Sequence, residues 1–316
     1  MVSNIKSLLI TGGSGFVGQS FLDHLATVPK ECLPHEIVVT AHNKHVKIPT
    51  RLRETIKVTE ILGNLSKPWE IDFRATHIVH LAADGSENAY TPKAAKNFEL
   101  MTKNLVSWCE GQESPVVFHA SSGACFGHIP LIEGEGIGNL SRNSSRKQIA
   151  LSSKKKKFIK SRLEAETILE KSSLEGAIDL RIGRLFSFIG NHLRDKSHYA
   201  VSAFVHMAET TKKIEITGNP STTRSYLSSA DMSSWIYKAL ESGISSEVLS
   251  IGSSTPVTIF ELASFIAEKS NSRVALLNPL VEGDYYVANN LSTCERLQEF
   301  ETEPWQTSIM KYMGIN

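Results

Sequence analysis

The chain has 316 residues, of which 41% are hydrophobic and 21% are charged, and its 34 Lys and Arg residues nearly balance 33 Asp and Glu residues. This length allows one large domain or two ordinary ones, since domains run to roughly 100–200 residues. A net charge of +1 argues against a nucleic-acid-binding protein, which usually carries a basic surplus. No apolar run reaches the roughly 20 residues that cross a bilayer, and the start of the chain does not fit a secretion signal. We therefore expect a cytoplasmic protein without a membrane span.

Short apolar segments rich in β-branched residues alternate with segments of helical periodicity in the first part of the chain. This alternation predicts an α/β fold built on a Rossmann-type, doubly wound parallel sheet. The expected strands are Ser7–Thr11, Glu36–Thr40, His77–Leu81, Val116–His119 and Ala177–Ile182, and the expected helices are Val17–Leu25, Lys93–Glu110 and Lys160–Ser172.

After about residue 185 the order of elements becomes irregular. The later candidates are helices over Ala200–Glu209, Ala230–Ser242 and Ile259–Lys269 and a strand over Lys213–Thr217. We therefore expect a dinucleotide-binding domain over residues 1–184, to which segments near 225–252 return. A smaller lobe over residues 185–316 is expected to be mainly substrate-binding.

A glycine motif, TGGSGFVG, directly follows the first expected strand and opens the first expected helix. Glycines at Gly12, Gly15 and Gly18 permit a tight turn and let a pyrophosphate approach the backbone N–H groups at the positive end of the helix. Phe16 and Val17 belong to the same turn. The motif predicts a dinucleotide site, and a purely structural turn is the alternative.

Further motifs follow in a fixed order along nearly the whole chain. They are Gly63–Leu65, His80–Ala83, Asn97, Ala120–Gly127, Arg181–Gly190, Thr223–Leu227 with Ala230 and Asp231, and Ile251–Ser253. With the G-x-x-G-x-x-G spacing, this set resembles the extended short-chain dehydrogenase/reductase family, which includes nucleotide-sugar epimerases and dehydratases. The resemblance implies a nicotinamide dinucleotide held also by Asn64, Leu65, Leu81, Ala82 and Ala83, and a nucleotide-sugar substrate. It also implies a homodimer formed through the helices near 93–110 and 160–172.

The end of the second expected strand bears on the choice between NAD and NADP. Ala41 occupies the place where an acidic residue would bind the adenosine ribose of NAD, and His42, Asn43 and Lys44 follow it. These three side chains could donate hydrogen bonds to a 2′-phosphate, which a carboxylate would repel. We therefore favour NADP, with a solvated loop and NAD as the alternative.

The catalytic residues that the resemblance implies are only partly present. Ser122 occupies the position of the catalytic hydroxyl, although it could instead cap a turn at the end of a strand. Phe158 and Arg162 occupy the positions of the Tyr and Lys that lie one helical turn apart. Phenylalanine has no proton to exchange, and arginine stays charged, so that Arg162 can only grip a ribose hydroxyl. Either another group transfers the proton or the site no longer turns over.

The expected substrate contacts are Ser187, Ala203, Phe204 and Arg224, and the resemblance implies that Arg224 pairs with the diphosphate. A surface arginine after a turn is the alternative for Arg224. Lys154–Lys157, within the Ser/Lys-rich stretch 141–157, is expected to be a solvated mobile loop, with a phosphate-attracting lid as the alternative.

Histidines and cysteines give no sign of a metal site. His77 and His80 lie three residues apart on an expected strand and so face opposite sides, and His119 is expected to be a hydrogen-bonded strand-end histidine. The four cysteines are widely spaced and are expected to be free thiols. They are Cys32, Cys109, Cys125 and Cys294.

Two classes of function remain. The first is a nucleotide-sugar epimerase or 4-keto reductase with an atypical catalytic site. A 4,6-dehydratase is disfavoured, because Gly123 and Ala124 stand where those enzymes usually carry an Asp–Glu pair. The second class is a cofactor-binding regulatory or scaffold protein whose active site has lapsed.

Overall fold

The computed structural model describes residues 4–83, 87–126, 129–130, 152–193, 199–277 and 283–315. Contacts between residues divide the chain into two compact units, each made of three segments. Unit 1 comprises Met1–Cys125, Ser152–Arg184 and Ser233–Leu249. Unit 2 comprises Phe126–Leu151, Leu185–Met232 and Ser250–Asn316. The segment that returns to unit 1 is thus narrower than the expected 225–252.

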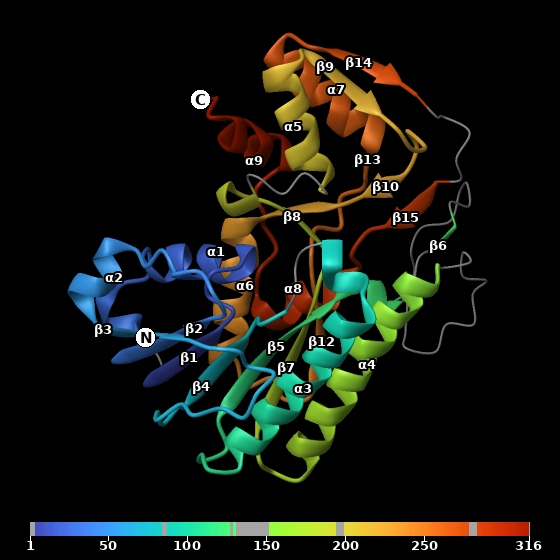
Figure 1. Cartoon of the computed structure of the whole chain (residues 1–316). Helices are drawn as coiled ribbons and strands as arrows, with labels where there is room; N and C mark the ends of the chain where they lie inside the picture. Colours follow the sequence, from blue (N-terminus) through green and yellow to red (C-terminus); the bar gives the residue numbers. More distant parts are fainter. Residues whose placement is uncertain are drawn as a thin grey trace. The chain divides into compact units, whose positions relative to one another are not determined.

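A seven-stranded sheet forms the centre of unit 1 (Figure 1). Its strands in spatial order are β12 (Glu247–Ile251), β7 (Asp179–Leu185), β5 (Val116–Ser122), β4 (His77–His80), β1 (Ser7–Thr11), β2 (Glu36–Ala41) and β3 (Lys57–Leu62). The pairs from β3 through β2, β1 and β4 to β5 are all parallel. The order of the strands reverses between β1 and β4, and ligands of such sheets bind beyond the carboxyl ends of the strands at that point. The doubly wound fold is confirmed.

The burial of each strand follows from its residue types and its place in the sheet. All five residues of β1 are buried, as expected for an apolar strand with neighbours on both sides and helices on both faces. In contrast, β3 lies at the edge of the sheet, where exposed and half-buried residues alternate. The sequence analysis missed β3, because Lys57, Thr59 and Glu60 interrupt its apolar pattern.

Helices of unit 1 lie against this sheet. They are α1 (Phe16–Leu25), α2 (Thr50–Thr55), α3 (Pro92–Cys109), α4 (Ser153–Leu174) and α6 (Ser229–Glu241), with the short 3-10 helices η1 (Lys30–Cys32), η2 (Glu87–Tyr90) and η3 (Gly123–Phe126). The prediction of a loop at Lys154–Lys157 was wrong, since these residues form the first turns of α4. The Ser152 side chain accepts a hydrogen bond from the Lys155 N–H and so caps the helix. Residues 141–151 lie outside the described ranges.

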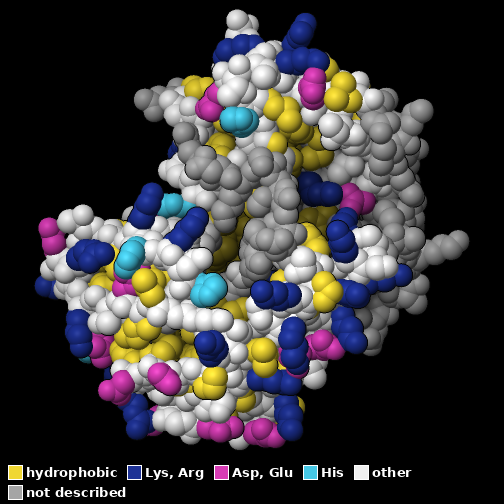
Figure 2. All heavy atoms as spheres, in the orientation of Figure 1, with side chains coloured by type: hydrophobic (Ala, Val, Ile, Leu, Met, Phe, Trp, Pro, Cys, Tyr) yellow, Lys and Arg dark blue, Asp and Glu magenta, His cyan; other side chains and the backbone are white. Residues whose placement is uncertain are grey.

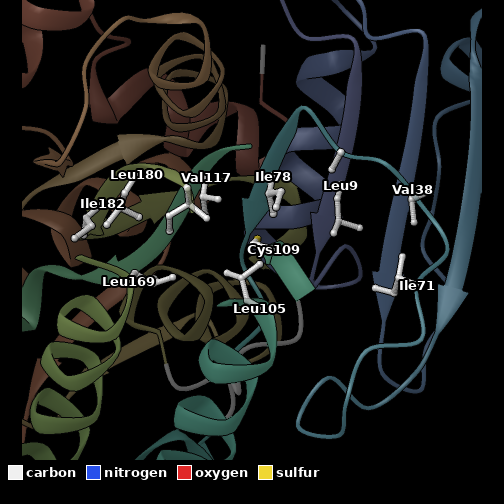
Figure 3. Packing of buried hydrophobic residues seen from close by; sticks show 12 residues of the cluster. Leu9, Val38, Ile71, Ile78, Leu105, Cys109, Val117, Leu169, Leu180 and Ile182 are labelled. Atoms are coloured by element: carbon white, nitrogen blue, oxygen red, sulfur yellow. The ribbon is translucent and has the colours of Figure 1, made fainter. Parts of the chain in front are cut away.

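The core of unit 1 lies between the sheet and the pair α3 and α4 (Figure 3). Leu105 and Cys109 project from α3 and Leu169 from α4 towards Val117 and Leu180 on the central strands. All five side chains are nearly inaccessible to solvent. This packing fixes the two helices relative to the sheet, and with them the side chains at the beginning of α4.

Unit 2 contains three small sheets and four α-helices in its described part. Its strands are β6 (Ile129–Pro130), β8 (Ser187–Ile189), β9 (Lys213–Ile216), β10 (Thr223–Arg224), β11 (Tyr226–Ser228), β13 (Val257–Thr258), β14 (Arg273–Leu276) and β15 (Asp284–Tyr286). Its helices are α5 (Ala200–Thr210), α7 (Ile259–Ser270), α8 (Leu291–Leu297) and α9 (Trp305–Met313), with η4 (Asn191–Leu193). β6 pairs with β15 and belongs to unit 2, although we expected residues 1–184 to belong to the dinucleotide-binding domain.

Charges on the surface are mixed. Figure 2 shows Lys and Arg side chains lying among Asp and Glu side chains on the face in view. Within the described ranges we find no helix with the length and apolar character of a transmembrane segment. All four cysteines are free thiols.

Candidate functional site

The glycine turn between β1 and α1 depends on three glycines for its backbone path. Gly12 has a positive φ of 73°, and a Cβ there would lie 2.9 Å from backbone atoms of Leu81 and Ala82. A Cβ on Gly18 would lie 2.5 Å from the Gly12 carbonyl oxygen, and one on Gly13 would overlap Val39. These glycines let the turn pack against the sheet, whether or not a ligand is present.

Gly15 differs from its neighbours, because a Cβ there would meet one backbone atom at a tight distance and would not overlap the protein. Its φ of −78° suits any residue, and a Cβ would meet only the Gly12 carbonyl oxygen, at 3.3 Å. Gly15 is the N-cap of α1, where no side chain caps the helix and no acidic residue occupies the first turn. This uncapped positive helix end, cleared of a Cβ, fits the pyrophosphate of a dinucleotide.

The turn after β2 presents the side chains expected to choose between NAD and NADP. His42, Asn43 and Lys44 are all exposed. The neighbouring carboxylate of Glu60 accepts hydrogen bonds from the Val46 N–H at 2.6 Å and from His45 Nδ1 at 2.9 Å. Burial raises the pKa of Glu60, but the hydrogen bonds from His45 and Val46 outweigh it and the pKa is lowered. The Glu60 carboxylate is therefore already hydrogen-bonded within the protein, and the sequence alone does not place it next to this turn.

The remaining cofactor candidates of unit 1 lie near the carboxyl ends of its strands. The Asn64 side-chain oxygen accepts hydrogen bonds from the backbone N–H and the hydroxyl of Ser66, so it shapes its own turn. Leu65 packs against the core, Ala82 is buried and Ala83 is exposed. The expected contact between Asn64 and an adenine stays a prediction.

Thr11 and His80 meet where the strand order reverses. The Thr11 hydroxyl accepts hydrogen bonds from the N–H groups of Leu81 and Ala82, so its own hydrogen points to His80 Nδ1, 2.9 Å away. We assign the proton of this imidazole to Nε2. Complete burial lowers the pKa of His80 to about 3, with a smaller contribution from the charge of Arg162. The ring is therefore neutral near pH 7.

His119 of β5 stacks on His80, with ring centroids 5.4 Å apart. It is fully buried, and neither of its ring nitrogens has a hydrogen-bond partner among the described residues. The hydrogen bond that we expected for this histidine is thus not found in the described part of the chain. Burial lowers the pKa of His119 well below its usual range, and the charges of His80 and Arg162 add to this effect.

Phe158 and Arg162 lie together, one turn apart on α4. The guanidinium carbon of Arg162 lies 4.6 Å from the ring centroid of Phe158 and 3.4 Å from that of Phe98 on α3. Arg162 is only 7% exposed. Two aromatic faces thus hold the cation in place. Its predicted contact with a ribose stays a prediction.

Ser122 lies half-buried at the end of β5, and its hydroxyl oxygen accepts a hydrogen bond from the Ala124 N–H at 3.2 Å. The hydroxyl hydrogen remains available to donate. The turn-capping role that the sequence left open is therefore present, and it does not prevent a catalytic role.

A buried ion pair, missed by the sequence analysis, lies beside this strand end. Arg184 donates from Nε and Nη2 to the two carboxylate oxygens of Glu166 on α4, at 3.0 and 2.7 Å, and the Ser121 hydroxyl donates to the same carboxylate at 2.5 Å. Both charged side chains are almost fully buried. Burial alone would lower the pKa of Arg184, but Glu166 raises it. This network fixes α4 against β5 and β7.

The expected substrate residues belong to unit 2. Arg224 forms an ion pair with Asp284, at 2.7 Å, and also donates to the Thr223 carbonyl oxygen. Ser187 and Ala203 are partly accessible, whereas Phe204 is buried in the interior of its unit. A diphosphate that binds Arg224 would therefore have to share the guanidinium with Asp284 or replace Asp284 as its partner. Within the described residues, no group of three or more His, Cys, Asp or Glu side chains is arranged to hold a metal ion.

Comparisons with known proteins agree with this architecture. The family described as the NAD dependent epimerase/dehydratase family matches residues 8–252. UDP-glucuronic acid decarboxylase 5 of Arabidopsis thaliana is 25% identical over 289 residues, which cover 89% of this chain and 77% of that protein. A structure of MoeE5 in complex with UDP-glucuronic acid and NAD has a TM-score of 0.78 at 19% identity and covers 98% of both chains. UDP-N-acetylglucosamine 4-epimerase from Methanobrevibacter ruminantium has a TM-score of 0.78 at 18% identity, with 98% of this chain and 97% of that chain covered.

The two structural similarities show a shared fold, and the family match extends over most of the chain. Together with the glycine turn and the strand order, they confirm the resemblance drawn from the sequence motifs. This chain belongs to the NAD-dependent epimerase/dehydratase family.

Proposed function

We propose that the chain binds a nicotinamide dinucleotide and acts on a nucleotide sugar as an epimerase or 4-keto reductase with an atypical catalytic site. The observation that carries this proposal is Gly15, a glycine with an ordinary φ whose Cβ would meet a single backbone oxygen, at an uncapped helix start. The bound nicotinamide would supply reversible hydride transfer at a sugar carbon. The backbone of Gly12–Gly18 would hold the pyrophosphate.

NADP is the proposed form of the cofactor. The exposed His42, Asn43 and Lys44 carry no negative charge that would repel a 2′-phosphate, and the Glu60 carboxylate is already engaged by His45 and Val46. The structural neighbour MoeE5 binds NAD. A preference for NAD over NADP is therefore the alternative.

UDP-sugars are the proposed substrates to test first, because MoeE5 has been seen with UDP-glucuronic acid and with UDP-glucose. Arg224 would bind the diphosphate and Ser122 would donate a hydrogen bond to the reacting oxygen. Ser187 and Ala203 would contact the sugar nucleotide, and Phe204 would support them from the interior of its unit.

A lapsed enzyme that only binds cofactor is the second candidate. Phe158 favours it, because a phenyl ring occupies the position where the family's phenol would lie. The burial of Arg162 between two aromatic rings also favours it, since the cation is held by the protein itself.

A product assay separates these two candidates. Wild type is incubated with NADP or NAD and a panel of UDP-, GDP-, CDP- and dTDP-sugars, and the products are identified by chromatography and mass spectrometry. We expect turnover that Ser122→Ala abolishes. A wild type that binds cofactor but shows no turnover would establish the lapsed site, and Phe158→Tyr with Arg162→Lys would then be the variant to restore activity.

A homodimer through α3 and α4 is also proposed. The two helices lie next to each other in unit 1 (Figure 1), and Leu163 and Leu174 of α4 expose 38% and 87% of their surface. Sedimentation velocity tests the proposal. A monomer for wild type at micromolar concentration would contradict it.

A further inference from the structure

We propose that Tyr90 supplies the phenol that α4 lacks, and that its hydroxyl exchanges the proton with the reacting oxygen of the sugar. This inference rests on the proposed function, because it needs an enzyme that still transfers hydride. The sequence shows no tyrosine near position 158 on the helix, but the fold brings one there from a distant segment.

The ring of Tyr90 lies against the ring of Phe158. Their centroids are 5.1 Å apart and the ring planes are tilted by 47°. Tyr90 is the last residue of η2, in the connection between β4 and α3. This connection leaves the sheet at the carboxyl end of β4, beside the point where the strand order reverses and where ligands of such sheets bind.

The backbone that carries Tyr90 is fixed by the start of α3. The next residue, Thr91, is the N-cap, and its side chain accepts a hydrogen bond from the Ala94 N–H at 3.2 Å. Pro92 follows at the first helical position, where its restricted φ favours the helix. A side chain on such a rigid support can hold a catalytic position that a mobile loop could not.

The surroundings of Tyr90 suit proton transfer better than packing. The residue is 40% exposed, and within the described part of the chain no hydrogen bond of its hydroxyl is found. The guanidinium of Arg162 also contacts Phe158, with its carbon 4.6 Å from the ring centroid. Phe158 thus contacts both a phenol carried by η2 and a cation carried by α4, the two kinds of group that the family carries on one helix.

The proton balance of the step is simple. In the reducing direction the ketone carbon gains a hydride from the reduced nicotinamide, and the ketone oxygen takes the proton of the Tyr90 hydroxyl to become an alcohol. The resulting phenolate regains its proton from water. The oxidising direction is the reverse, in which the alcohol oxygen gives its proton to the Tyr90 oxygen as the hydride leaves carbon.

The experiment uses the full chain loaded with NADP or NAD, with UDP-glucuronic acid and UDP-glucose as probes. Single-turnover reduction of the nicotinamide is followed at 340 nm, and the affinity for each probe is measured by calorimetry. Tyr90→Phe is compared with wild type and with Tyr199→Phe, a tyrosine of similar exposure at 43%. The double variant Tyr90→Phe with Phe158→Tyr moves the phenol back onto α4.

We expect Tyr90→Phe to slow the turnover by roughly 10²–10⁴-fold at unchanged probe affinity, because only the proton exchange is lost. Tyr199→Phe should keep the wild-type rate, and the double variant should recover part of it. Wild-type turnover that survives Tyr90→Phe would overturn the role of Tyr90 alone. Cofactor-loaded wild type without turnover on either probe or on the wider sugar panel would overturn the proposed function as well.

Discussion

The glycine turn after β1 and the first turns of α4 differ in the groups with which each would act on a ligand. The turn keeps its three glycines, its positive φ at Gly12 and its uncapped helix end. The helix carries Phe158 and Arg162, which we propose stand at the positions of the family's catalytic pair. The turn recognises its ligand through backbone groups, so it depends on the fold, whereas the helix depends on two side chains that a substitution can remove without affecting the fold. We therefore expect that cofactor binding can persist in a chain whose catalytic side chains have been replaced.

The largest effect on stability is expected at Glu166, the buried carboxylate of α4. Replacing it in Glu166→Ala leaves Arg184 charged, buried and without its carboxylate, which should lower the free energy of unfolding by about 3–5 kcal/mol. Urea denaturation measures this loss. Glu164→Ala is the matched control, because its ion pair with Lys160 is exposed and should cost less than about 0.5 kcal/mol. Equal losses of unfolding free energy in the two variants would mean that the buried ion pair stabilises the fold no more than the exposed one.

Arg224 of unit 2 is a further case in which binding would depend on one side chain. Arg224→Ala should weaken the binding of a UDP-sugar by roughly a hundredfold, or about 2–3 kcal/mol, since a charge-assisted contact to the diphosphate is lost. Asp284→Asn should strengthen binding, because the guanidinium is released from its ion pair. Calorimetry measures both. Unchanged affinity in Arg224→Ala would leave Arg224 as the structural partner of Asp284.

Within the glycine turn, two single substitutions separate packing from ligand binding. Gly18→Ala should lower the free energy of unfolding by about 1–3 kcal/mol, because the new Cβ meets backbone at 2.5 Å. Gly15→Ala should cost less than about 1 kcal/mol, since only the Gly12 carbonyl oxygen lies near, at 3.3 Å. Thermal and urea unfolding test the contrast. A Gly15→Ala variant as unstable as Gly18→Ala would make Gly15 a packing glycine as well.

The buried imidazoles lie between the turn and α4, and they predict a pH dependence of stability. The pKa of His80 is lowered to about 3 from 6.5, so the unfolded chain binds more protons than the folded one at pH values between these limits. The free energy of unfolding should therefore fall as the pH drops below about 6.5, by up to about 1.4 kcal/mol per pH unit for each such group. His119→Leu should make this slope shallower between about pH 6 and pH 4. An unchanged slope would show that His119 charges without cost.

The smallest effect concerns cofactor choice. Lys44→Glu should weaken NADPH binding by about three- to tenfold and leave NADH nearly unaffected, because exposed charges are screened by salt. Fluorescence titrations at low and high salt measure the change. Equal weakening of both cofactors would remove Lys44 from the 2′-phosphate site.

Prediction from the sequence worked best where a local pattern determines the backbone. The apolar runs of β1 and β2 and the glycine turn between β1 and α1 were found because periodicity and glycine spacing are local signals. The sequence could not show that Tyr90 lies against Phe158, that His119 is buried against His80, or that Asp284 pairs with Arg224. These contacts join distant segments and depend on the tertiary fold. Lys154–Lys157 was misjudged because composition outweighed the capping serine at position 152.

The central claim is that the dinucleotide site remains intact in a chain whose α4 lacks the catalytic tyrosine. The most direct test titrates wild type and Gly15→Ala with NADPH and NADH and follows the fluorescence of the bound nicotinamide. We predict saturable binding well below millimolar concentration for wild type, with NADPH preferred, and at least about tenfold weaker binding for Gly15→Ala. No binding of either cofactor to folded wild type up to millimolar concentration would contradict the account.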